Sequence, residues 1–174
     1  TEMFLMFKNP VLGVLAGTVL TGVIQSSSAS VGILQALSVT GAVSYAAAIP
    51  IIMGQNIGTT VTAMLSSVGT NKNAKRAAVV HLMFNVIGVV VLLTVFCIVK
   101  AIFAPALLNE PATRAGIAVA HSVFNILCTA ILLPAGNLLE KLAIRMVPDE
   151  KQEQKTVELD ERLLATPSIA LRQS

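Results

Sequence analysis

The chain has 174 residues, of which 55% are hydrophobic and only 12% are charged, and its mean hydropathy is +0.79. Soluble domains carry about twice that charged fraction, and a domain of this size has too little interior to bury so much apolar sequence. The net charge of +3 does not indicate nucleic-acid binding, because the Lys and Arg residues lie at segment ends and the chain has one Tyr and no Trp to stack on bases.

Long uncharged segments set the expected fold class. No Asp, Glu, Lys, Arg or His occurs between residues 9 and 71, and the stretches 77–99 and 115–139 hold only His81 and His121 respectively. A helix needs about 20 apolar residues to cross a bilayer, because each residue rises about 1.5 Å through a core of about 30 Å. The sequence therefore predicts an all-α integral membrane protein.

The first segment, 10–39, has two short apolar arms, 10–24 and 29–39, on either side of the polar sequence 25–28. Arms of about 10 to 14 residues are shorter than a comfortable membrane span and are more often re-entrant. Irregular backbone at membrane depth is tolerated only inside protein or beside a cavity. We therefore expect a re-entrant helical hairpin that enters and leaves the membrane on the same side.

The second segment, 43–68, is long enough to span the membrane, but its sequence is interrupted. Residues 54–60 contain two glycines and four uncharged polar residues, and Pro50 lies just before them. Glycine weakens an α-helix, and proline removes one backbone N–H and crowds the preceding turn. This segment is predicted to be a discontinuous transmembrane helix.

The third and fourth segments, 76–103 and 114–143, are predicted to be uninterrupted spans, and the fourth continues as a helix to about residue 147. The predicted transmembrane part is therefore 1–147, which we expect to begin within a longer protein. Residues 148–174 are a charged linker, and Thr166 followed by Pro167 marks a helix start. We expect that helix to open a further helical domain.

Charge asymmetry predicts the orientation. A returning hairpin followed by three crossings places the basic loop Lys72, Lys75 and Arg76 on the same side as the C-terminal tail. Because Lys and Arg are in excess on the cytoplasmic side of membrane proteins, we expect this side to be cytoplasmic and the hairpin to open outward.

The hairpin turn is the first candidate binding site, and its residues are Gln25, Ser26, Ser27 and Ser28. Hydroxyls in an apolar setting are costly unless they find partners, and they can donate to anion oxygens or offer lone pairs to a cation. The second arm starts here, so its free N–H groups favour an anion such as phosphate. The alternative is that these side chains only connect helices.

The interrupted helix is the second candidate site. Unwound carbonyls, an amide and hydroxyls suit a hard cation such as sodium, and transporters place such breaks near the midplane. The alternative is a packing notch formed by Gly54 and Gly58. The candidate residues are Gln55, Asn56, Thr59 and Thr60.

Two later spans share a His-x-x-Phe-Asn unit, at His81 to Asn85 and at His121 to Asn125. The spacing from the preceding Arg differs, so this is a local echo, and structural hydrogen bonding is the favoured interpretation of both histidines. The apolar stretches 9–71, 77–99 and 115–139 contain no carboxylate, and a proton relay would normally use one. Sodium coupling is therefore favoured over proton coupling. The serines have no base nearby in sequence, so an enzyme is not expected.

These motifs together resemble the type II sodium/phosphate cotransporter family. The resemblance rests on Gln25-Ser26-Ser27-Ser28-Ala29, on Asn56-Ile57-Gly58-Thr59-Thr60, on the unit 81–85 and on the tail, in that order along the chain. Bacterial members carry a cytoplasmic PhoU-like helical domain, and residues 160–171 look like the entry to such a domain.

The resemblance implies two inverted repeats, each with a Gln-Ser-Ser hairpin and a broken helix, with phosphate and sodium bound where the hairpins meet. Gln25 and Ser26–Ser28 would then bind phosphate, and Ser27, Ser28, Gln55, Asn56, Thr59 and Thr60 would bind sodium. Only one such motif is present, so the chain is similar to the second repeat alone. It would act with a first repeat or a second copy in the bacterial inner membrane, without an organic cofactor. Two alternatives remain: transport of another small oxyanion, or a membrane anchor for a signalling domain.

Overall fold

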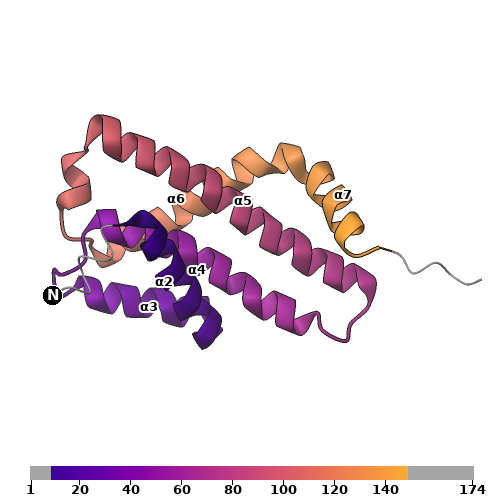
Figure 1. Ribbon diagram of the computed structural model, residues 1–174. Helices are drawn as coiled ribbons and strands as arrows, with labels where there is room; N and C mark the ends of the chain where they lie inside the picture. Colours follow the sequence, from indigo (N-terminus) through magenta and orange to yellow (C-terminus); the bar gives the residue numbers. More distant parts are fainter. Residues whose placement is uncertain (1–8, 149–174) are drawn as a thin grey trace, which may run out of the picture.

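The computed structural model describes residues 9–148, and this part of the chain is helical apart from its turns and one isolated bridge (Figure 1). Three helical stretches are long and apolar enough to cross a membrane, namely α4, α5, and α6 continued through α7. The expected all-α membrane class is thereby confirmed. The elements are α2 (Pro10–Ile24), α3 (Ser27–Ser38), α4 (Tyr45–Ser66), α5 (Lys72–Phe103), η1 (Ala106–Asn109), α6 (Arg114–Leu132), η2 (Leu133–Ala135) and α7 (Gly136–Met146).

The helices α2 and α3 form the two arms expected from the sequence, and local signals explain their ends. Asn9 caps α2 by accepting a hydrogen bond from the Val11 N–H, with Pro10 at the first helical position. The helix stops at Gln25, whose φ of 54° is left-handed. Ser26 then caps α3 by accepting from the Ala29 N–H. A two-residue turn thus reverses the chain.

The helix α4 corrects one prediction, because it runs as a continuous α-helix from Tyr45 to Ser66 and has no break at residues 54–60. The polar side chains do not compete with the helix here, because they donate to carbonyls of their own preceding turn. Asn56 Nδ2 donates to Ile52 O, Thr59 Oγ1 to Gln55 O and Thr60 Oγ1 to Ile57 O. Pro50 is also accommodated within the helix, as prolines in membrane helices commonly are.

Glycines bring the backbones of α2 and α4 into direct contact. A Cβ at Gly17 would overlap the Ile51 carbonyl, and a Cβ at Gly54 would overlap the Val14 carbonyl. Two notches, each with glycines four residues apart, therefore face one another, which is the small-residue packing seen between membrane helices. Thr18 Oγ1 also donates across the contact to Gly54 O at 3.1 Å. This packing fixes α2 along the middle of α4, from Pro50 to Val61.

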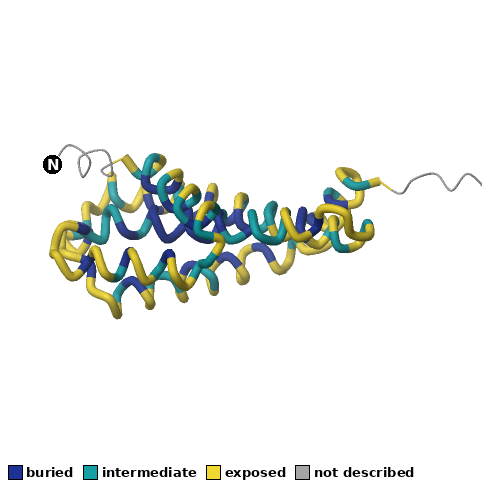
Figure 2. Tube along the Cα trace, turned by 90° about the horizontal axis from the view of Figure 1, so that it is seen from below, coloured by how far each residue is buried: buried dark blue, intermediate teal, exposed yellow. Residues whose placement is uncertain are grey.

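The remaining helices run back and forth beside α4. Figure 1 shows α5 antiparallel to α4, and α6 leading back to the bent α7. The bend follows Pro134, which lies in the short 3-10 turn η2 and cannot continue the hydrogen-bond ladder. Buried residues gather where the helices face each other, and the outward faces are exposed (Figure 2). Many of the exposed residues are Val, Ile and Leu, as expected of a surface that contacts lipid.

The two ends of the bundle are held together by different contacts. At one end, the turn after α3 meets the η1–α6 loop, where Ala112 N donates to Val43 O at 2.8 Å. At the other end, Arg76 Nε donates to Val147 O at 3.0 Å, so the basic start of α5 lies beside the end of α7. The residues beyond Pro148, including the expected linker and further domain, lie outside the described residues.

Candidate functional site

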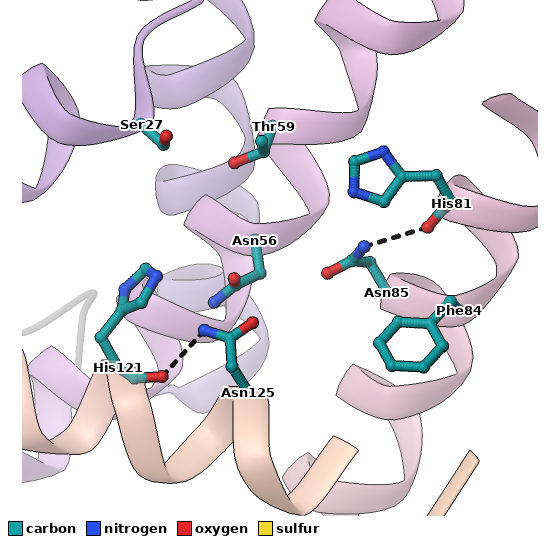
Figure 3. Close-up of a pocket in the computed structure, with 8 residues that line it drawn as sticks. All are labelled: Ser27, Asn56, Thr59, His81, Phe84, Asn85, His121 and Asn125. Atoms are coloured by element: carbon teal, nitrogen blue, oxygen red, sulfur yellow. Dashed lines mark hydrogen bonds between the residues drawn. The ribbon is translucent and has the colours of Figure 1, made fainter. Parts of the chain in front are cut away.

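A polar pocket of about 300 Å³ opens between four of the helices, at the tip of the hairpin (Figure 3). Its walls are formed by α3, by the middle of α4, by α5 and by α6. All eight lining residues are uncharged or histidine. They are Ser27, Asn56, Thr59, His81, Phe84, Asn85, His121 and Asn125.

The hairpin contributes Ser27, the first residue of α3. Its neighbours lie around the turn rather than in the pocket wall. Gln25 and Ser28 are exposed, and Ser26 Oγ lies 3.4 Å from Ser28 Oγ while it caps the helix. The N-terminus of α3, with its positive dipole end, therefore begins at the pocket. Of the four residues predicted to bind phosphate, the structure brings Ser27 alone into the pocket lining.

The helix α4 contributes Asn56 and Thr59, which lie one turn apart and face the pocket (Figure 3). Asn56 is buried and its Nδ2 donates to the Ile52 carbonyl at 3.0 Å. Thr59 is half-buried and its hydroxyl donates to the Gln55 carbonyl at 2.9 Å. Because each side chain donates a hydrogen bond to its own helix, the oxygen lone pairs of both side chains remain available as acceptors.

The other two predicted sodium ligands on α4 lie outside the pocket. Thr60 is fully buried, with its hydroxyl donating to Ile57 O at 2.7 Å. Gln55 is also fully buried and connects α4 to the hairpin, because its Nε2 donates to both Oγ (2.9 Å) and O (3.0 Å) of Ser30. Thr21 Oγ1 donates to the same Ser30 hydroxyl at 2.7 Å. This buried cluster fixes the hairpin tip against α4.

The pocket also contains residues that the sequence interpretation treated as structural. Asn85 Nδ2 donates to His81 O at 2.9 Å, and Asn125 Nδ2 donates to His121 O at 2.8 Å. The two units are thus built alike and face each other across the pocket (Figure 3). His121 Nδ1 is buried without a hydrogen-bond partner in the part of the chain described. The echo of His-x-x-Phe-Asn in two spans was the signal for this half of the pocket.

The chemistry of the pocket is that of neutral oxygen and nitrogen groups. No carboxylate, Lys or Arg is among its lining residues, and within residues 9–148 no group of His, Cys, Asp and Glu could hold a metal ion. Amide and hydroxyl oxygens suit a hard monovalent cation, while hydroxyls and helix N–H groups suit an anion. Fold and pocket together define a polytopic membrane protein with a polar pocket among apolar helices.

Sequence comparison identifies the group of proteins to which this architecture belongs. The sequence profile of the Na+/Pi-cotransporter family matches residues 3–111, more than half of the chain. The chain therefore belongs to the Na+/Pi-cotransporter family. This family is defined by transport, in agreement with the expectation that the chain is not an enzyme, and its name pairs the two ions expected from the motifs.

Individual relatives agree with this assignment. The chain is 35% identical over 136 residues to the uncharacterized protein YqeW of Bacillus subtilis (strain 168), covering 77% of this chain and 43% of the relative. It is 42% identical over 96 residues to human sodium-dependent phosphate transport protein 2B, covering 52% and 14% respectively. The rat sodium-dependent phosphate transport protein 2A is 42% identical over 94 residues, covering 51% and 15%. The chain thus spans less than half the length of these relatives. No solved structure matches the chain.

Proposed function

We propose that this chain supplies one of the two halves of a sodium-coupled symporter for inorganic phosphate. The supporting observation is the pocket itself, which joins Ser27 at the hairpin tip to Asn56 and Thr59 on α4. These two motifs lie about thirty residues apart in sequence, and both were predicted to bind ions. The family membership and the names of the mammalian relatives favour sodium and phosphate as those ions.

In this proposal the residues divide into ion contacts and supports. Phosphate binds at the start of α3 through Ser27, with Ser26, Ser28 and Gln25 available at the exposed turn. Sodium binds beside it, on the oxygens of Asn56 and Thr59. The two remaining candidates act as supports, because the Gln55 amide donates to Ser30 and the Thr60 hydroxyl to its own helix.

The remaining features of the proposal concern the whole transporter. The hairpin α2–α3 is re-entrant, because its arms are shorter than the three spanning helices and its tip lies beside the middle of α4 (Figure 1). A first repeat or a second copy covers the exposed side of the turn, and ions cross by alternating access between the halves. The basic end near Arg76 and Arg145 faces the cytoplasm of a bacterial inner membrane, where the PhoU-like domain follows.

The test is phosphate uptake into proteoliposomes by the full-length protein, with and without an inward sodium gradient. The variants are Ser27→Ala and Asn56→Ala, with Ser122→Ala as a matched control because Ser122 is exposed and bonds only to its own helix. We expect sodium-dependent uptake that falls at least tenfold in both site variants and stays unchanged in the control. Uptake unaffected by either site variant would contradict the placement of the site.

The same assay separates the alternative functions. Competition by excess sulfate equal to that of unlabelled phosphate would indicate a general oxyanion transporter. A folded, inserted protein without any uptake would favour the membrane anchor. Phosphate uptake that does not depend on sodium would support transport but contradict sodium as the coupling ion.

A further inference from the structure

We propose that Asn85 and Asn125, together with Asn56, present three carboxamide oxygens to a single sodium ion in the pocket. This inference rests on the proposed function and adds two ligands that the sequence motifs do not assign. The three residues come from α5, α6 and α4, so the ion would connect three separate helices.

The orientation of each carboxamide carries the argument. All three side chains make the same bond, in which Nδ2 donates to the carbonyl four residues earlier: Ile52, His81 and His121, at 3.0, 2.9 and 2.8 Å. Because the amide hydrogen is committed to the helix, the Oδ1 atom is directed away from it. Figure 3 shows the three carboxamides around a common space, with the Asn85 oxygen directed toward α4 and the Asn56 side chain directed toward His121 and Asn125. No hydrogen bond within the described chain uses these oxygens.

The chemistry of the set selects the ion. Amide oxygens are hard neutral donors, and the nearby Thr59 hydroxyl adds a fourth oxygen to the same wall. Without a carboxylate, a divalent cation would be desolvated with little compensation, and the neutral set therefore favours a monovalent cation. A transition metal is disfavoured as well, because oxygens outnumber the two imidazoles.

The arrangement also explains why the sequence echo is local. A ligand of this kind needs only an Asn and the carbonyl one turn before it, so the four-residue spacing of His81 to Asn85 and of His121 to Asn125 suffices. The Phe of each unit differs in its role: Phe84 lines the pocket, whereas Phe124 is buried in the core. The feature that both units share in three dimensions is therefore the asparagine, at Asn85 and Asn125, whose oxygen is the proposed ligand.

The experiment measures sodium-dependent thermal stabilisation of the full-length protein in detergent, without phosphate, over a series of sodium chloride concentrations at constant ionic strength in choline chloride. A ligand that binds only the folded state raises Tm with its concentration. The variants are Asn85→Ala, Asn85→Asp, Asn125→Ala and Asn125→Asp. Asn137→Ala is the control, because Asn137 is exposed on α7 and does not line the pocket.

We expect both alanine variants to raise the half-maximal sodium concentration at least tenfold and the control to leave it unchanged. Aspartate keeps an oxygen and adds charge, so it should retain or strengthen the sodium response. A purely structural role predicts the opposite pattern: alanine and aspartate both lose the donated hydrogen bond, lower Tm equally in choline, and leave the sodium response intact. That result, or a wild-type protein without any sodium response, would overturn the site. Absence of phosphate uptake beside a normal sodium response would overturn the proposed transport alone.

Discussion

The contact between α2 and α4 makes a quantitative prediction at Gly58. A Cβ placed there would lie 2.7 Å from the Thr18 carbonyl oxygen, 2.7 Å from Thr21 Cβ and 3.0 Å from the Gly22 nitrogen. Two of these three atoms belong to the backbone of a helix, so no rotamer change can relieve the overlap. The substitution Gly58→Ala therefore forces the two helices apart by several tenths of an ångström.

The expected cost follows from two opposing effects. Overpacking a close contact costs about 1–3 kcal/mol, whereas replacing glycine by alanine inside a helix gains roughly 0.5–1 kcal/mol. We expect Gly58→Ala to lower the free energy of unfolding by about 1–2 kcal/mol. The control is Gly32→Ala on α3, where a Cβ meets nothing within 4 Å. That variant should be neutral or slightly stabilised.

The assay is unfolding of the full-length protein in mixed micelles as the fraction of denaturing detergent rises, followed by far-UV circular dichroism. The midpoint should move to lower denaturant for Gly58→Ala and stay or rise for Gly32→Ala. If the two variants gave the same midpoint, the inferred backbone contact between α2 and α4 would be refuted, since helix propensity alone treats both positions alike.

Two further predictions concern the supports of the pocket and the coupling of its ions. Ser30→Ala removes the hydroxyl that accepts hydrogen bonds from both Thr21 and Gln55. It should destabilise the protein by about 1–3 kcal/mol in the same unfolding assay, because the buried Thr21 hydroxyl is left without an acceptor. If the double variant Thr21→Val, Ser30→Ala lost the sum of the two single effects, a shared bond would be contradicted. Sodium and phosphate should strengthen each other's binding by the same factor, which isothermal titration of each ion with and without the other would measure; independent affinities would contradict a common pocket.

The sequence predicted the helices and their turns well because the signals for them are local. The polar turn at Gln25 and Ser26 lies between two apolar arms, and Asn9, Ser26 and Thr113 each cap a helix within three residues of their own position. The number of membrane-capable helices followed from charge-free length in the same way. Information of this kind is carried by neighbouring residues.

The continuity of α4 could not be predicted in that way. Gly54, Asn56 and Gly58 weaken an isolated helix, and the compensation comes from a helix about forty residues earlier. The backbone of α2 packs into the space that side chains at Gly54 and Gly58 would occupy. The Asn and Thr side chains donate hydrogen bonds to their own helix and do not unwind it. In the sequence interpretation a packing notch at Gly54 and Gly58 was the alternative to a broken helix, and the structure contains that notch.

The rotation of α5 and α6 was equally inaccessible. Pattern alone could not decide whether the two asparagines of the echoed unit face lipid, core or pocket, because both spans are apolar on nearly every side. Packing of Gly88 on α5 against Cys128 on α6 sets that rotation, since a Cβ at Gly88 would lie 2.6 Å from the Cys128 sulfur. With that contact fixed, Asn85 and Asn125 fall on the faces that meet the hairpin tip.

A pocket without fixed charge has a consequence for coupling. A cation or an anion entering alone would lose much of its hydration in return for neutral dipoles, which is unfavourable at membrane depth. A sodium ion on the asparagine oxygens would offset part of the negative charge of a phosphate at the start of α3, because both would lie in one pocket, in a medium where charges attract strongly. The absence of a lining carboxylate therefore supports coupling rather than weakening it: a fixed negative charge would hold sodium without phosphate, and would repel the anion whose entry the sodium is needed to favour.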